Sequence, residues 1–264
     1  MKIVQKIEAD FRAAGIEFGK LSPPSSQAGS ILTMDSGIAV DDLNWVWNKR
    51  SLSPDDITEI RRLKKHFQRL SIPFWWWVYP GGQSPATQEI LQEQGFRFLK
   101  AVPCLAMRLN KRNVALSDCN SLHSITVKVV AGKDDLVLWE KLSFRGFAMP
   151  LETEKEYSAF INSWNVPANE HLRLFNAYAD GKPTASGLLL FHEKTAGIYF
   201  LSVLPECRKR GIGLALTVAL LQYAHRVDYK LCVLQSSEEG FKVYQRAGFR
   251  HLCSADIYVP AAQP

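Results

Sequence analysis

The chain has 264 residues, of which 47% are apolar and 22% charged, the balance of a soluble globular protein with room for two ordinary domains. No stretch reaches the roughly 18 apolar residues of a membrane helix, and acidic residues stand where a signal peptide would have its apolar core. We therefore expect a cytoplasmic protein without a membrane partner. The net charge of +6 suits an anionic ligand, but no run of five Lys or Arg indicates nucleic-acid binding.

The cysteines are odd in number and form no CxxC pair, which argues against a disulfide framework and a zinc site. We expect no metal and reduced, mostly buried thiols at Cys104, Cys119, Cys207, Cys232 and Cys253.

In the N-terminal half, Ser53-Pro-Asp-Asp56 predicts a helix start with Pro in the first turn, and the helical period continues to Leu70. Residues 74–78 read as a strand. Side chains alternate along a strand, so Trp75 and Trp77 should share one face and Trp76 should take the other. Core packing is the expected role of these rings.

A polar stretch without periodicity predicts a linker at 113–124, which separates a domain at 1–112 from one at 125–264. After it, apolar periodicity and turn residues predict the order β-α-α-β-β-β-α-β-α-β. The strands are 125–130, 171–179, 184–192, 197–204, 231–234 and 250–259, and the helices are 134–147, 152–164, 211–226 and 238–246.

The motif Arg208-x-x-Gly211-x-Gly213 lies between a strand that stops at Pro205 and the helix that starts near Gly211. Unpaired N–H groups and the helix dipole make a helix N-terminus an anion site. Glycine lets a phosphate approach the backbone closely, and Lys209 and Arg210 add charge. The pattern is neither the GxGxxG dinucleotide fingerprint nor a Walker loop.

With Val203 and Pro205 before it, this motif resembles the GNAT superfamily of N-acetyltransferases, which the downstream Tyr244-x-x-x-Gly248-Phe249 also resembles. The resemblance implies an α/β (α+β) fold, with a mixed, mostly antiparallel sheet flanked by helices, and acetyl-CoA as acyl donor. It also implies that backbone groups of Leu201 and Val203 pair with pantetheine.

The same resemblance assigns the diphosphate to a cradle formed by Arg208, Lys209, Arg210, Gly211, Ile212 and Gly213. It makes Tyr244 the general acid that protonates the departing thiolate, with a core tyrosine as the alternative. The family's usual Asn is Ser237 here and its usual Ala is Gly240, so cofactor contacts from Ser237 are an open point.

The general base is poorly marked in the sequence. The candidates are surface carboxylates and two imidazoles, or ordered water in their place: Glu193, Glu238, Glu239, His171 and His192.

An internal repeat relates the two halves. Residues 91–99 and 244–252 share five of nine positions, at the offset of 153 residues that separates Gly95 from Gly248. The N-terminal unit is therefore expected to be a second, degenerate GNAT-like domain, as in tandem proteins such as mycothiol synthase.

At this offset the N-terminal unit has lost the residues of the motif. Arg208 corresponds to Asp55, Gly211 to Thr58 and Tyr244 to Leu91, while Gly213 corresponds to Ile60. Carboxylates in the first turn repel a diphosphate. We predict a single acetyl-CoA site, in the C-terminal half.

Two functions remain open from the sequence. The first is an N-acetyltransferase that acts by direct attack of a primary amine of a small molecule or peptide. In that case the tryptophans have an alternative to core packing, as an aromatic wall of the acceptor pocket. The second is a non-catalytic acyl-CoA-binding or regulatory protein. We expect a monomer, because the repeat fills the surface through which single-domain relatives dimerise.

Overall fold

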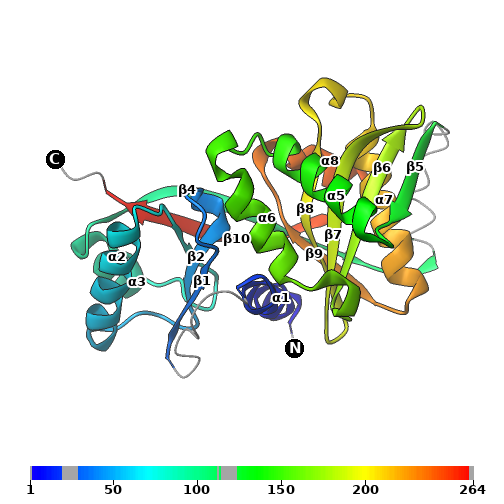
Figure 1. The fold of residues 1–264 in the computed structure, drawn as a ribbon. Coiled ribbons are helices and arrows are strands. Elements are labelled where there is room, and N and C mark those ends of the chain that lie inside the picture. Colours follow the sequence, from blue (N-terminus) through cyan, green and yellow to red (C-terminus); the bar gives the residue numbers. More distant parts are fainter. Residues whose placement is uncertain (1, 20–28, 112, 114–123, 262–264) are drawn as a thin grey trace.

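The computed structural model describes residues 2–19, 29–111, 113 and 124–261. The predicted linker lies almost wholly outside these residues, as does Cys119. The described strands form one continuous ten-stranded sheet in the order β1-β2-β3-β10-β4-β9-β8-β7-β6-β5, with helices on both faces (Figure 1). The predicted fold class is thus confirmed, and the strands of the two units join in a single sheet.

The N-terminal half begins with a long helix that packs against strands of both halves of the sheet. Its helices are α1 (Ile3–Phe18), α2 (Ile57–Leu70) and α3 (Pro85–Glu93), and its strands are β1 (Ile31–Asp35), β2 (Asn44–Asn48), β3 (Trp75–Val78) and β4 (Phe96–Arg108).

In the C-terminal half every predicted element is present within two residues of its expected bounds. The strands are β5 (Ile125–Val129), β6 (Leu172–Ala179), β7 (Lys182–His192), β8 (Thr195–Val203), β9 (Leu231–Gln235) and β10 (Arg250–Pro260). The helices are α5 (Lys133–Gly146), α6 (Glu154–Ser163), α7 (Ile212–Arg226) and α8 (Glu238–Arg246).

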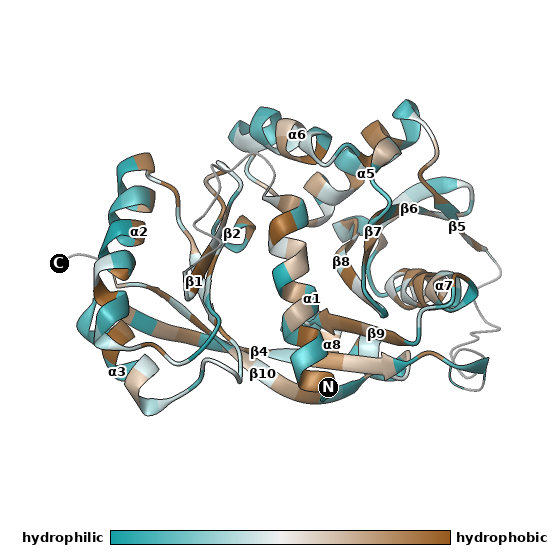
Figure 2. Ribbon diagram, turned by 90° about the horizontal axis from the view of Figure 1, so that it is seen from below, coloured by the Kyte–Doolittle hydropathy of each residue, from teal (hydrophilic) through white to brown (hydrophobic). Residues whose placement is uncertain are grey.

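The two halves exchange strands at the middle of the sheet. β10 from the C-terminal half lies between β3 and β4, and β4 from the N-terminal half lies between β10 and β9. Figure 2 shows these two strands running together from one half to the other. The ladder between them joins the halves through backbone hydrogen bonds as well as through side chains.

The exchange follows an approximate two-fold axis. Val102 pairs with Ala255, and these residues stand 153 positions apart, the offset of the sequence repeat. The register of the ladder shifts at Leu252 on β10 and at Leu99 on β4, which are again repeat equivalents. The repeat seen in the sequence is therefore also a repeat of the strand pairing.

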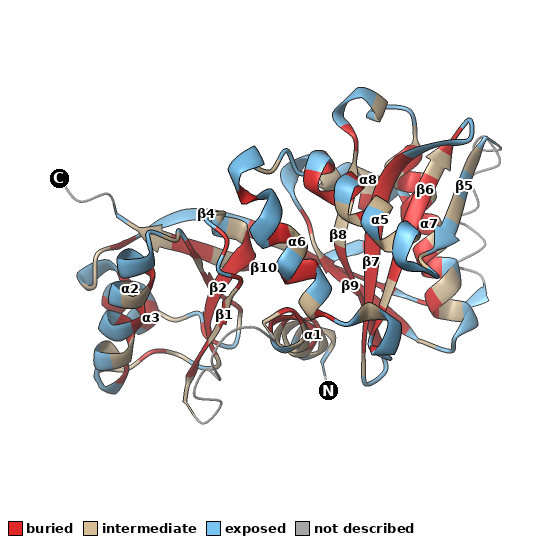
Figure 3. Ribbon diagram, in the orientation of Figure 1, coloured by how far each residue is buried: buried red, intermediate tan, exposed pale blue. Residues whose placement is uncertain are grey.

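Three apolar clusters hold the layers together (Figure 3). One face of the sheet packs on α1, α5 and α6, and the other packs on α7 and α8 in one half and on α2 and α3 in the other. Trp75 and Trp77 lie on the first face and Trp76 lies on the second, as the alternation predicts. All three serve as packing residues, and Trp76 is fully buried.

Among the described residues no helix is long and apolar enough to cross a membrane. Within the same ranges, no group of three or more His, Cys, Asp or Glu side chains is placed to hold a metal ion.

Candidate functional site

The site begins where β8 leaves β9. These parallel strands pair only from Thr195 to Gly197, whose partner is Val233, and the rest of β8 diverges from β9. The cause is local: Phe200 has a left-handed φ of 49°, and the register with β7 shifts at this point. Such a bulge bends a strand and ends its pairing on one side.

The bulge leaves backbone groups of β8 facing the diverging side. Leu204 donates its N–H to the Thr184 carbonyl of β7 at 2.9 Å. Because N–H groups alternate in direction along a strand, those of Leu201 and Val203 point away from β7, toward the side that β9 has left. At Leu201 and Val203 the backbone of β8 thus has no pairing with β9.

The diverging strand leads directly into the N-terminus of α7. Lys209 and Gly211 both have left-handed backbone, with φ of 60° and 80°, and alternation of this kind makes successive N–H groups converge. No side chain caps the helix, and its first turn holds no acidic residue. The N–H groups at Ile212 and Gly213 are therefore left without a side-chain cap, at a helix start where the dipole favours an anion.

The two arginine side chains of the motif point in different directions. The Arg208 guanidinium donates to the carbonyls of Gly146 at 3.0 Å and Val203 at 3.3 Å, and lies 3.8 Å from the Glu239 carboxylate. Arg210 instead pairs with Asp180 at 2.9 Å, beyond β6. The Arg208 side chain therefore lies beside the end of β8, whereas the Arg210 side chain points away to the turn after β6.

Tyr244 lies on α8, with 8% of its surface exposed, and its ring packs edge-on against Phe249. Burial, with a smaller effect of Cys232, raises the pKa of its hydroxyl well above the usual value. The phenol therefore keeps its proton at neutral pH. Within the described residues the hydroxyl makes no hydrogen bond, so it can donate to a ligand.

The two departures from the family pattern lie beside this ring. Ser237 caps α8, because its Oγ accepts the Gly240 N–H at 3.1 Å. A Cβ on Gly240 would lie 2.9 Å from the Tyr244 ring. The glycine thus allows the tyrosine to lie closer to the helix than an alanine would, and Ser237 is committed to the cap through its acceptor oxygen.

Three of the five base candidates lie beside the turn that precedes β8. Glu193 and His192 are at the turn that precedes β8, and His171 pairs with Phe191 beside them. Of the remaining two, Glu239 is the carboxylate near Arg208, and Glu238 is on the exposed first turn of α8.

Sequence reasoning missed a carboxylate on α1. Asp10 is fully buried, and its Oδ2 accepts a hydrogen bond from the Tyr199 hydroxyl of β8 at 2.8 Å. Burial raises its pKa to about 8, although the hydrogen bond from Tyr199 lowers it. A signal was present in the sequence, because Asp10 stands in the apolar stripe of an amphipathic helix, together with Ile7, Phe11 and Ala14.

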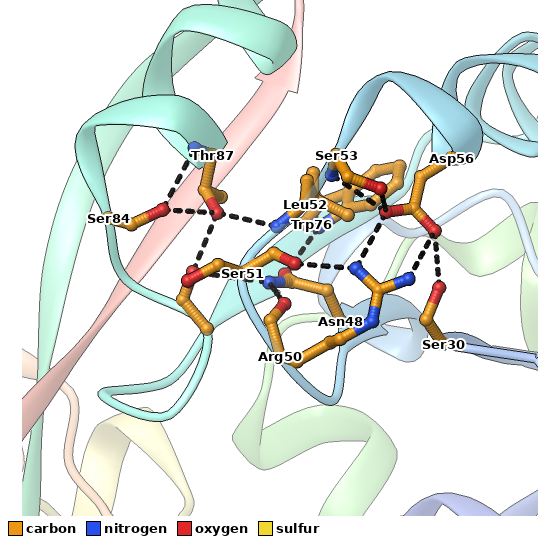
Figure 4. A network of polar contacts seen from close by, with 11 residues as sticks. Ser30, Asn48, Arg50, Ser51, Leu52, Ser53, Asp56, Trp76, Ser84 and Thr87 are labelled. Carbon is orange, nitrogen blue, oxygen red and sulfur yellow. Dashed lines mark hydrogen bonds and ion pairs between the residues drawn. The ribbon is translucent and has the colours of Figure 1, made fainter.

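The corresponding place in the N-terminal half is closed. β2 and β3 pair as far as Trp47 and Trp77 without diverging. Beyond that point Asn48 bridges the strands, since its Oδ1 accepts from Trp76 Nε1 at 3.1 Å and its Nδ2 donates to the Arg50 carbonyl at 2.7 Å (Figure 4). The Asn48 side chain thus links the ends of β2 and β3.

The start of α2 is occupied by the chain's own carboxylate (Figure 4). Asp56 accepts hydrogen bonds from Ser53 N at 2.8 Å, from Arg50 at 3.0 Å and from Ser30. Burial acts to raise the pKa of Asp56, but these partners together hold it below its usual value. A negative charge therefore lies at the start of α2. The first turn of α7, its counterpart in the C-terminal half, holds no acidic residue.

Comparison with known proteins agrees with this geometry. Residues 134–249 match the acetyltransferase (GNAT) family. No curated protein matches the chain. Among solved structures it is similar to a GCN5-related N-acetyltransferase from Kribbella flavida, with a TM-score of 0.70, 16% identity and coverage of 97% of this chain and 96% of that one.

Two further structures show the same fold. A GCN5-related N-acetyltransferase from Sphaerobacter thermophilus has a TM-score of 0.63 and 14% identity over 89% of this chain and 78% of its own. A tandem GNAT protein from the clavulanic acid biosynthesis pathway has a TM-score of 0.57 and 14% identity over 83% and 76%. The chain therefore has the fold of the GCN5-related N-acetyltransferases, and its residues 134–249 match the acetyltransferase (GNAT) family.

Proposed function

We propose that the protein is an N-acetyltransferase that moves an acetyl group from acetyl-CoA to a primary amine of a small molecule or peptide. The observation that carries the proposal is the continuity of β8 with α7: backbone groups freed by the Phe200 bulge lead into a helix start without a cap or an acidic residue. An extended thioester with a diphosphate at one end fits this combination.

The chain's own residues would hold that group in two parts. The backbone of Leu201 and Val203 would pair with the pantetheine amides, as an additional strand does. The segment from Arg208 to Gly213 would take the diphosphate through N–H groups, with Arg208 exchanging a carbonyl for a phosphate oxygen. A Cβ on Gly213 meets nothing closer than 3.6 Å, so close approach there depends on Gly211 more than on Gly213.

When bound, acetyl-CoA supplies the acetyl thioester whose C–S bond breaks as the new C–N bond to the amine forms. The Val203 N–H would donate to the carbonyl oxygen of that thioester and stabilise its developing charge. Tyr244 would give its proton to the departing sulfur. The raised pKa of Tyr244 keeps that proton in place until negative charge develops on the sulfur.

In this proposal residues 125–264 form the acetyl-CoA-binding domain, and residues 1–112 form a degenerate unit that binds no acetyl-CoA. Ser237 would contribute, if at all, by donating its hydroxyl proton, because the oxygen already accepts the Gly240 N–H. No metal is required. We propose that the enzyme is a cytoplasmic monomer, since the exchanged strands already fill each unit's central sheet position.

The test is to incubate the protein with acetyl-CoA and a panel of primary amines and to follow release of free thiol. Tyr244→Phe should lower kcat by roughly 100-fold or more, as expected for the loss of a general acid. Tyr178→Phe, on the surface of β6, is the matched control and should be unchanged. Acetyl-CoA binding without turnover of any amine would point to the acyl-CoA-binding alternative.

A further inference from the structure

The buried carboxylate of Asp10 lies at the point where β8 and β9 separate. A Cβ built on Gly197, the last paired residue of β8, would be 2.2 Å from Asp10 Oδ2. Only a glycine at position 197 leaves room for this carboxylate.

Figure 2 shows α1, which carries Asp10, between the N-terminal strands and β8. Two residues further along β8, Tyr199 donates to Asp10, and the bulge at Phe200 follows directly.

Polar groups around Asp10 have unfilled hydrogen-bonding capacity. Asp10 Oδ1 and the Tyr79 hydroxyl are buried, and neither has a partner within the described residues. Gln235, at the end of β9, approaches the Tyr199 hydroxyl, yet its Nε2 lacks a partner in hydrogen-bond geometry. Buried polar atoms are nearly always paired in native proteins. The free oxygen of Asp10 and the two groups beside it can therefore take a polar partner.

The charge of the groups around Asp10 indicates the charge of the ligand. Asp10 faces Tyr199 from β8, Tyr79 beyond β3 and Cys232 from β9, and the thiol of Cys104 on β4 faces the same tyrosines. All of these groups are neutral or acidic, and among the described residues no cationic side chain acts on the pKa of Asp10. A buried carboxylate without a cation is costly unless it is protonated or paired.

We propose that this cluster, Asp10 with Tyr199, Tyr79 and Gln235, is the acceptor site, where Asp10 binds the ammonium group of a primary amine and takes its proton. The donors on Tyr79 and Gln235 would bind an oxygen of the same molecule, so the acceptor is a primary amine with a hydroxyl, carbonyl or carboxylate nearby. This inference rests on the proposed N-acetyltransferase function and supplies the base that the sequence did not mark.

The proton transfer is balanced within the pair. The ammonium nitrogen gives one proton to ionised Asp10 Oδ1, which leaves a neutral amine with a free lone pair and a neutral carboxylic acid. The pKa of about 8 that burial gives Asp10 lies two to three pH units below that of an alkylamine, about 10.4, instead of more than six units below it. The buried carboxyl is therefore a far better match for this transfer than one at the surface.

The consequence for the two halves is that the unit which lost the acetyl-CoA motif keeps a chemical role. α1 belongs to the N-terminal half, and it places Asp10 against β8 of the other half. Neither half would hold a complete site by itself.

The experiment compares the wild type with Asp10→Asn, which keeps an oxygen to accept the Tyr199 hydrogen bond. The probes are ethanolamine, glucosamine, spermidine and Nα-acetyl-lysine. Calorimetry measures amine binding in the absence of acetyl-CoA, and thiol release measures turnover. We expect Asp10→Asn to weaken amine binding by roughly tenfold or more, to lower kcat by roughly 100-fold or more, and to leave acetyl-CoA affinity within about twofold. Asp134→Asn, in the exposed first turn of α5, is the control.

A second measurement needs no variant and remains available if Asp10→Asn does not fold. At pH 7 the carboxyl is mostly protonated, so pairing with an ammonium must release about one proton to the buffer. Calorimetry in two buffers of different ionisation enthalpy counts that proton, and the count should vanish above about pH 9.

The outcomes are distinguishable. If the wild type acetylates none of the four amines, the proposed function fails. If it acetylates one of them, and Asp10→Asn keeps both its kcat and its amine affinity, the function stands and the assignment of Asp10 is wrong. Amine binding without proton release at pH 7 would also overturn the assignment.

Discussion

Ser84 and Ser237 cap α3 and α8 in the same way, although they belong to different halves of the chain. Ser84 Oγ accepts the Thr87 N–H at 3.1 Å, and Ser237 Oγ accepts the Gly240 N–H at 3.1 Å. The two serines are 153 positions apart, the offset of the sequence repeat. The repeat therefore preserved the device that starts a helix, while the residues proposed for chemistry survive only beside Ser237.

The start of α7 should be sensitive to negative charge. Gly211→Asp keeps the helix start, since Asp is a good N-cap and tolerates left-handed backbone better than most residues. The added carboxylate should weaken acetyl-CoA binding by about 2–3 kcal/mol, roughly 30- to 150-fold, by occupying the N–H groups and repelling phosphate. Calorimetry measures this loss.

The control for that variant is Gly37→Asp. Gly37 has a similar φ of 75°, and a Cβ there meets no atom within 4 Å. It makes the same charge change far from the site and should leave the affinity within about twofold. Equal affinity for Gly211→Asp and the wild type would contradict the placement of the diphosphate.

The position of the Tyr244 ring should depend on Gly240. Gly240→Ala places a methyl group 2.9 Å from Cε2 of that ring, so the tyrosine must move. We expect kcat to fall by roughly 10- to 100-fold, because a displacement near 1 Å is enough to disturb a positioned proton donor. Gly213→Ala adds the same methyl at an ordinary distance of 3.6 Å and should retain kcat. A loss shared equally by both variants would argue against this account.

Acetyl-CoA should bind once per chain. In the C-terminal half β8 diverges from β9 and leads into α7, whose first turn holds no acidic residue. In the other half β2 and β3 pair up to Trp47 and Trp77, and Asp56 accepts hydrogen bonds at the start of α2. A calorimetric titration should therefore give a stoichiometry near one. A second equivalent of acetyl-CoA that survives Gly211→Asp would show that the N-terminal half also binds.

Asp56 should matter for stability and not for acetyl-CoA. Asp56→Asn removes the charge that Ser30, Ser53 and Arg50 share, and should lower the free energy of unfolding by about 1–3 kcal/mol. Its folded pKa is depressed, so its contribution is present above its unfolded pKa and is lost as the pH falls through the folded pKa. Denaturant unfolding at pH 7 and at acid pH, with exposed Asp55→Asn as control, measures both effects. Acetyl-CoA affinity should not change.

Asp10 has the opposite pH dependence. Its pKa is raised from 3.8 to about 8 in the folded protein, so its contribution to stability is present below the unfolded pKa and is lost as the pH rises toward the folded one. The free energy of unfolding of the wild type, minus that of Asp10→Asn, should fall between about pH 5 and 8, by at most ~1.4 kcal/mol per pH unit. Parallel stability curves for the two proteins would mean that Asp10 is ionised throughout this range.

The segment from β8 to α7 could be predicted from the sequence because its structure depends on residues close together in the chain. Val203, Pro205 and Gly211 end a strand, turn the chain and start a helix within nine residues, and each step depends on its own residue type. The strand exchange was not readable. The pattern of residues 250–259 predicts a strand, but which strands flank it depends on pairings with residues more than a hundred positions away.

The role of Asp10 could not be predicted either, because it depends on contacts with residues far along the chain. Its position in an apolar stripe marks it as unusual, but its meaning depends on Gly197 and Tyr199, nearly 190 positions further along the chain. The directions of Arg208 and Arg210 were likewise out of reach, because they are set by Gly146 and Asp180 on other elements.

The exchange of β4 and β10 also constrains how the protein acquires its structure during synthesis. The sheet of the N-terminal half has no strand between β3 and β4 until residues 250–260 have been made. Until then β3 and β4 present unpaired edges, the kind of surface that invites aggregation or pairing with another chain. The sheet of the first half is therefore complete only once the last strand of the second has been made, and a chain truncated within α8 would lack a central strand.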